Sequence, residues 1–103
     1  MYRPLPDNLT IKKSNIEGLG LFTTENVETE HIFGITHIQH KDFQNGHIRT
    51  PLGGFINNSD NPNCILIYES TSAWSLMKLK SIRVIWEGEE ITLKYQNMGY
   101  QIK

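Results

Sequence analysis

The balance between β-branched residues and alanine is the feature of this sequence that most limits its fold. The chain contains 13 isoleucines and eight threonines but a single alanine, Ala73. Alanine is the best helix former, whereas β-branched side chains favour strands. No segment keeps a sustained helical period of apolar residues. We therefore expect a mostly β protein of short strands with little helix.

The length and charge of the chain limit its class further. With 103 residues, it is expected to form one domain, with a core over about residues 9–95 and a short C-terminal tail at 96–103. The formal net charge of −1 argues against a dedicated nucleic-acid binder. Apolar residues make up 38% and charged residues 20%, as is typical of a soluble globular chain.

Signals for membranes, secretion and metals are also missing from the sequence. No apolar run reaches the roughly 18 residues of a membrane span, and no secretory signal is visible at the N-terminus. Cys64 is the only cysteine, so neither an intrachain disulfide nor a cysteine zinc cluster is possible. The four histidines match no zinc spacing, and no metal site is expected. The absence of these signals favours an intracellular protein, in the cytoplasm or, if the chain is viral, in a host cell.

Apolar and β-branched residues predict several short strands. Alternation or an apolar run marks residues 9–13, 31–38, 64–68, 73–77, 81–86 and 91–95. Residues 39–50 are polar and read as a connection. Sharp turns separate these segments.

Three segments carry polar chemistry or glycines beyond what strands require. Gly18-Leu19-Gly20 is either a plain turn or a bend that lets the backbone approach a ligand. A dinucleotide fingerprint would need a third glycine and a following helix. Residues 57–63 include four asparagines. Asn57 and Asn58 follow an apolar pair, so we expect at least one of them at the inner end of the loop, where it must bond either backbone or a ligand.

The third segment, residues 87–95, has the sequence E-G-E-E-I-T-L-K-Y. Its glutamates predict a solvated acidic turn, which is followed by a strand. Tyr95 at its end reads from the residues alone as a core aromatic with its hydroxyl at the edge.

In this order, the three segments resemble the SET domain of protein lysine methyltransferases. Residues 55–63 read F-I-N-N-S-D-N-P-N, similar to the family's F-I-N-H-S-C-x-P-N, and residues 88–95 are similar to its G-E-E-L-T-x-D-Y. Gly18-Leu19-Gly20 is similar to the family's first cofactor motif. The resemblance implies a β-clip fold of several small sheets, whose C-terminal segment threads beside the asparagine loop in a pseudoknot-like arrangement.

The resemblance also implies a cofactor, S-adenosyl-L-methionine, and the residues that bind it. The cofactor-binding residues carried over from the family pattern are Gly18, Leu19, Gly20, Asn57, Asn58, Tyr95 and Tyr100. The Leu19 backbone would hold the methionine end, the Asn57 amide its amino group, and the Asn58 backbone the adenine. Tyr100 is placed by position only, as an aromatic that stacks on adenine or closes the channel.

Tyr95 is the catalytic residue that the resemblance implies. It would line the channel for the target lysine and direct its hydroxyl at the amine or the transferring methyl group. A phenol with a pKa of about 10 is a poor base at neutral pH, so its role is orientation and electrostatic support.

The chain departs from the family pattern in five respects. Asn58 stands in place of the usual histidine, and Asp60 in place of the usual cysteine. Leu66 lies where some members have a further channel tyrosine. Residues 39–54 are shorter than the family's substrate-groove insertion, and no cysteine-rich tail follows. The small size resembles stand-alone bacterial or viral members.

The sequence leaves three functions open. The first is methyl transfer to a lysine of a protein or peptide, with a basic tail as one substrate. The second is a non-catalytic SET-like module that binds a peptide or partner protein. The third is methylation of a small molecule or non-histone target. A short groove also makes a homodimer an expectation.

Overall fold

The protein is described here by a computed structural model covering residues 4–40, 42–43, 46–70 and 74–94. In these ranges, the regular structure consists of eight strands and one 3-10 turn. In chain order these are β1 (Leu9–Lys13), β2 (Leu19–Thr23), β3 (Ile32–Gln39), β4 (His47–Arg49), η1 (Pro51–Gly53), β5 (Asn57–Asn58), β6 (Cys64–Ser70), β7 (Ser75–Ser81) and β8 (Thr92–Leu93). Within these ranges, no helix is long and apolar enough to cross a membrane.

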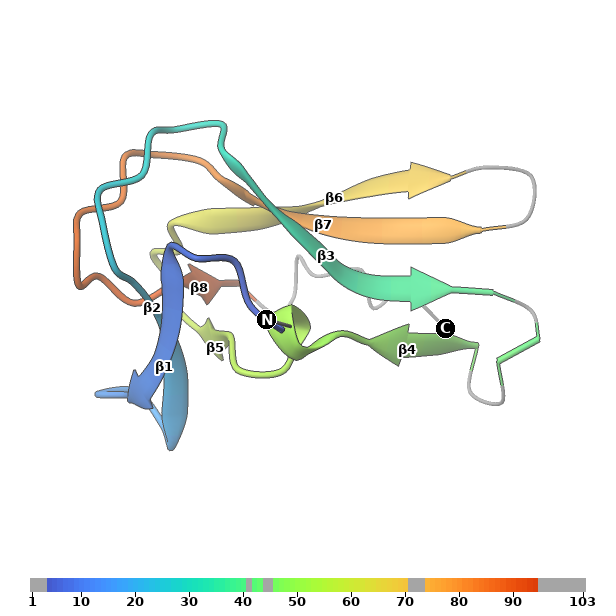
Figure 1. Cartoon of the computed structure of the whole chain (residues 1–103), viewed down its shortest axis with the longest axis horizontal. Coiled ribbons are helices and arrows are strands. Elements are labelled where there is room, and N and C mark those ends of the chain that lie inside the picture. Colours follow the sequence, from blue (N-terminus) through green and yellow to red (C-terminus); the bar gives the residue numbers. More distant parts are fainter. Residues whose placement is uncertain (1–3, 41, 44–45, 71–73, 95–103) are drawn as a thin grey trace.

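The strands form three small sheets, as Figure 1 shows. The largest has the order β4-β3-β7-β6 and is antiparallel throughout. The β1–β2 hairpin forms a second, antiparallel sheet. The third pairs β5 with β8 in parallel, with Asn57 opposite Thr92 and Asn58 opposite Leu93. The expected mostly β fold of several small sheets is confirmed.

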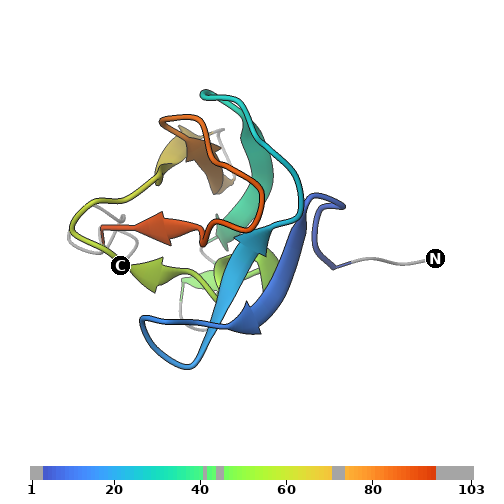
Figure 2. The ribbon, with the colours of Figure 1, turned by 90° about the vertical axis from the view of Figure 1, so that its left-hand side faces the viewer.

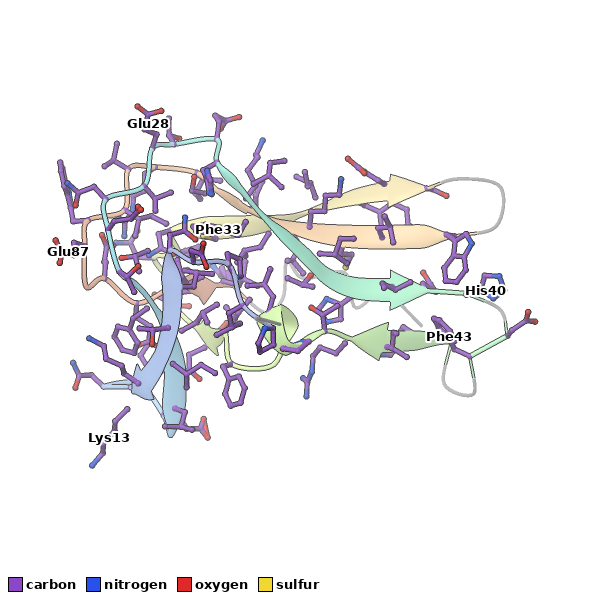
Figure 3. The ribbon with its side chains drawn as sticks, viewed as in Figure 1. Lys13, Glu28, Phe33, His40, Phe43 and Glu87 are labelled. Atoms are coloured by element: carbon purple, nitrogen blue, oxygen red, sulfur yellow. The ribbon has the colours of Figure 1, made fainter. Side chains whose placement is uncertain are left out.

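The hydrophobic core draws residues from all three sheets and from the connections between them. Figure 3 shows Phe33 pointing into the interior, whereas Glu87 lies outside at one end of the molecule. Cys64 is fully buried, and burial raises the pKa of its thiol to about 12. The core consists of Leu9, Leu21, Val27, Phe33, Leu52, Ile56, Cys64, Leu79, Ile85, Ile91 and Leu93.

Two strand predictions require correction. The strand expected at 81–86 is wrong, because β7 ends at Ser81 and only Ile85 forms a further bridge, with Val27. The segment is rich in apolar residues, but most of them are exposed, and no neighbouring strand pairs with the rest of it. Conversely, β4 lies inside the polar connection expected at 39–50. As a short edge strand without a buried residue, β4 has no apolar pattern to detect.

The strands around the asparagine loop are shorter than expected. Residues 57–63 begin with the two-residue strand β5 and only then form a loop. In the part of the 91–95 segment that the structure describes, only Thr92–Leu93 is strand. The pairing of β5 with β8 confirms that the C-terminal segment approaches the asparagine loop.

Candidate functional site

One C-terminal segment joins the glycine bend and the asparagine loop. On one side, the Thr23 N–H donates to the Glu89 carbonyl at 3.0 Å, and the Ile91 N–H to the Leu21 carbonyl at 2.7 Å. On the other side β8 lies along β5, as Figure 2 shows. Two motifs that are distant in sequence are thereby held on either side of the same short segment. This region, comprising residues 14–20, 57–63 and 87–93, is called the junction below.

Asn63 fastens the asparagine loop to the C-terminal segment. Its side chain is 1% exposed. Its Oδ1 accepts the Thr92 N–H at 2.9 Å, and its Nδ2 donates to the Glu90 carbonyl at 2.7 Å. A single side chain therefore satisfies two backbone groups that have no regular ladder partner, which explains why this asparagine is buried.

The glycine bend is closed by Ser14. Its backbone N–H donates to the Gly18 carbonyl at 2.8 Å, and its hydroxyl accepts the Ile16 N–H at 2.8 Å. Gly18 has φ +50°, a left-handed conformation that glycine adopts without steric cost. The first glycine of the motif is thus required by the turn.

The second glycine of the motif, Gly20, is required for a different reason. A Cβ at Gly20 would overlap the carboxylate of Glu90, which lies directly against the bend. The Ser14 hydroxyl donates to this carboxylate, 2.8 Å from Oε1 and 2.9 Å from Oε2. Gly20 therefore makes room for Glu90, and Ser14 holds Glu90 in place.

Asn57 lies at the centre of the junction. Its Nδ2 is 2.8 Å from Glu90 Oε2 and lies 3.1 Å and 3.3 Å from the carbonyl oxygens of Glu17 and Leu19. Because all three neighbours are acceptors, only an amide with nitrogen on this side avoids repulsion. Among the described residues, Oδ1 has no donor. Within that part of the chain, the side chain therefore offers one acceptor without a partner at the glycine bend.

The other expected cofactor residues are placed only in part. Leu19 is 53% exposed, and Asn58 is exposed on β5 next to Asn57. Gly18, Leu19, Gly20, Asn57 and Asn58 are brought together at the junction. Tyr95 and Tyr100 lie outside the described residues, so their expected roles stay predictions.

Glu89 stabilises the turn that leads into the C-terminal segment. Its carboxylate accepts the Trp86 N–H at 2.9 Å and pairs with Arg83 at 2.8 Å. Burial alone would raise the pKa of this carboxyl, but the hydrogen bonds from Trp86, Arg83 and Asn63 outweigh burial and lower it.

The expectation of a solvated acidic turn therefore fits Glu87 alone. The carboxylates of Glu89 and Glu90 both accept hydrogen bonds within the fold. The sequence interpretation also missed the roles of Ser14, Asn63 and Glu90. Their only local signal was position, directly before the glycine bend and inside two recognised motifs. Contacts across such sequence distances leave no periodic pattern.

The histidines lie away from this site. His37 and His47 are neighbours on β3 and β4, with ring centroids 6.3 Å apart. Burial, His47 and Arg49 lower the pKa of His37. His40 packs with Phe43 and Trp74 at the opposite end of the molecule, where Figure 3 labels the first two. Among the described residues, no group of three potential metal ligands occurs.

Comparison with known protein families identifies the family of this chain. The family model described as SET domain matches residues 31–96. This chain belongs to the SET domain family. The matched range of the SET domain includes Asn57, Asn58 and Tyr95, but it begins after the glycine bend. No curated protein matches the chain.

Solved structures support the same fold for this SET domain. A Plasmodium falciparum protein, described as a candidate histone methyltransferase, is similar over 85% of this chain and 92% of its own, with 21% identity and a TM-score of 0.71. A humanized mutant of the Chaetomium thermophilum Polycomb Repressive Complex 2, bound to the inhibitor GSK126, also has 21% identity and a TM-score of 0.71. The similarity covers 90% of this chain but only 15% of that chain.

Proposed function

We propose that this SET domain transfers a methyl group from S-adenosyl-L-methionine to a lysine side chain of a protein or peptide. The observation that carries the proposal is the Asn57 Oδ1, which has no donor among the described residues, at the glycine bend where Leu19 is 53% exposed. An amide oxygen next to backbone carbonyls is suited to an ammonium group, such as the one on the methionine end of this cofactor. Family membership and the similarity to proteins described as methyltransferases support this choice.

The residues present fit the cofactor at one end. Asn57 would accept from the amino group, and Leu19 would supply backbone contacts to the methionine end. Asn58, which is exposed on β5, would serve the adenine through its backbone. When bound, the cofactor supplies an electrophilic methyl group. The chain would hold the lysine amine in line with that group and exclude water around it, so its main contribution is positioning.

Tyr95 is proposed as the residue that orients the amine. In the sequence it comes two residues after β8, the strand that contacts the asparagine loop. A phenolic hydroxyl can both donate and accept a hydrogen bond. Tyr100 is proposed as a cover for the adenine.

Calorimetric titration with S-adenosylhomocysteine tests cofactor binding. The unmodified chain should bind in the micromolar range, and Asn57→Ala should weaken binding about tenfold, as expected for a lost hydrogen bond to a charged group. Asn61→Ala is the matched control, because Asn61 is exposed in the same loop and, towards the described residues, makes a hydrogen bond only through its backbone. Equal affinities of both variants would reject the Asn57 contact.

A methyl-transfer assay on lysine peptides tests the reaction. Tyr95→Phe should keep cofactor binding and lose most turnover. Equal turnover of the two forms would remove Tyr95 from the mechanism. A basic peptide is the first substrate to try, although only Glu87 of the acidic turn leaves its carboxylate free of a described partner to attract one.

A non-catalytic interaction module is the second candidate. It is favoured by the segment between β3 and β5, where the described residues form only the three-residue β4 and the 3-10 turn η1. Such a small segment offers little surface for a substrate groove.

A second copy of the chain could complete the groove, so we propose a homodimer as the active form. Sedimentation of the purified chain, followed by turnover assays across its dissociation range, separates these cases.

A further inference from the structure

We infer that Glu90 is a positioning residue, which orients the Asn57 amide so that Oδ1 faces the cofactor's ammonium group. This inference rests on the proposed cofactor and names how its amino group is selected. Glu90 itself is not placed in contact with the cofactor. Its influence passes through the 2.8 Å hydrogen bond from Asn57 Nδ2 to Oε2.

The orientation of an asparagine amide is a choice between two similar shapes. Rotation by half a turn exchanges nitrogen and oxygen with almost no change in the space filled. Two carbonyl oxygens, of Glu17 and Leu19, already favour nitrogen on the inner side, at 3.1 Å and 3.3 Å. The Glu90 contact is shorter and carries a full negative charge, so it contributes most to the preference.

Glu90 is itself held in a defined position. Ser14 is 8% exposed, and its single hydroxyl proton is shared between the two carboxylate oxygens. The Ser14 oxygen accepts the Ile16 and Glu17 N–H groups, so its proton can only point towards Glu90. Gly20 leaves the space that the carboxylate fills. Ser14 and Gly20 thus fix one carboxylate, which in turn fixes one amide.

The negative charge also has an electrostatic consequence. A carboxylate that accepts from one end of an amide polarises it and strengthens the oxygen at the other end as an acceptor. A cationic amine at Oδ1 would benefit twice, from the orientation of the amide and from its polarisation by the carboxylate. A ligand without that amine would benefit from neither.

The test compares two ligands, S-adenosylhomocysteine and its analogue in which hydrogen replaces the amino group. Glu90→Gln should weaken binding of S-adenosylhomocysteine about tenfold and change the analogue's dissociation constant less than about twofold. Glu87→Gln is the matched control, because this exposed carboxylate lies in the same turn, and it should change neither value. If Glu90→Gln does not fold, Ser14→Ala carries the same comparison.

A double variant separates indirect from direct action. In the Asn57→Ala background, Glu90→Gln should cause no further loss, because the amide that transmits its effect is gone. A further tenfold loss there would mean that the carboxylate contacts the amine itself, and would overturn the positioning role. Equal weakening of both ligands by Glu90→Gln, or no weakening of either, would also overturn it.

The wild-type titration is made first and distinguishes this inference from the proposed function. If the folded wild-type chain binds neither ligand, the cofactor proposal fails, and the role of Glu90 towards it fails as well. If it binds S-adenosylhomocysteine but Glu90→Gln matches the wild type on both ligands, only the positioning role fails.

Discussion

The four-stranded sheet and the junction are stabilised by different kinds of interaction. In the sheet, β3, β7 and β6 are joined by long antiparallel pairing between backbones, which two register shifts interrupt between β3 and β7. Its charged contacts are partly exposed, such as Lys78 with Glu69 at 2.9 Å, and pairs of this kind contribute little. In the junction, the strands have two residues each, and individual polar side chains supply the missing contacts.

This difference teaches where residue identity matters. A backbone ladder forms with almost any side chain on its exposed face, provided that the buried face stays apolar. The junction instead depends on an asparagine at 63, a serine at 14 and a glutamate at 90, because each makes hydrogen bonds that an apolar side chain cannot make. The proposed site lies where identity matters most.

Truncation of the sheet's core should have the largest effect on stability. Leu79→Ala removes a fully buried side chain and should lower the free energy of unfolding by about 2–5 kcal/mol. Ile48→Ala, at a side chain 46% exposed on β4, should cost less than about 1 kcal/mol. Urea titration followed by tryptophan fluorescence measures both. Similar losses would show that burial does not control the stability of this sheet.

The junction should respond almost as strongly to loss of a polar group. Asn63→Ala leaves the buried Thr92 N–H and Glu90 carbonyl without their partner, and should cost about 2–4 kcal/mol. Asn61→Ala in the same loop should cost less than about 0.5 kcal/mol. The same urea titration applies. A small loss for Asn63→Ala would contradict the view that polar side chains stabilise the junction.

Replacing a glycine by alanine should have a smaller effect on stability, which depends on the space around that glycine. Gly20→Ala would push against the Glu90 carboxylate and should cost about 1–3 kcal/mol. It should also weaken S-adenosylhomocysteine binding, because Glu90 would move. Gly54→Ala is the control: its φ of −87° suits alanine, and its Cβ would make only ordinary contacts. Thermal unfolding and calorimetry check both variants, and equal melting temperatures would rule out the predicted conflict.

Acidification should reveal the smallest difference. The folded-state pKa of Glu89 lies below its unfolded value of about 4.3. Its stabilisation is therefore complete above that pH and is lost as the pH falls through the folded-state pKa. The stability difference between the wild type and Glu89→Gln should shrink below about pH 4. A difference that stays constant between about pH 6 and pH 3 would contradict this assignment.

Residue patterns predicted much of the sheet. The scarcity of alanine and the abundance of isoleucine indicated strands, and β1, β3 and β6 lie close to the expected segments. Each has alternating or continuous apolar residues that face the core or a neighbouring strand. Strand β4 was not predicted, and the loop after Ser81 was predicted to be a strand. In both places, pairing depends on a neighbouring segment rather than on a local pattern.

The sequence by itself determined the strand-rich class and the order of three motifs, which is sufficient to suggest the SET family. It also placed Asn57 among the candidate ligands. Only the tertiary structure decided which atom of Asn57 is open, why Gly20 has no side chain, and that Glu90 is bonded within the fold. The physical reason is that these properties arise from hydrogen bonds between residues far apart in the chain. Local composition and periodicity carry no information about such partners.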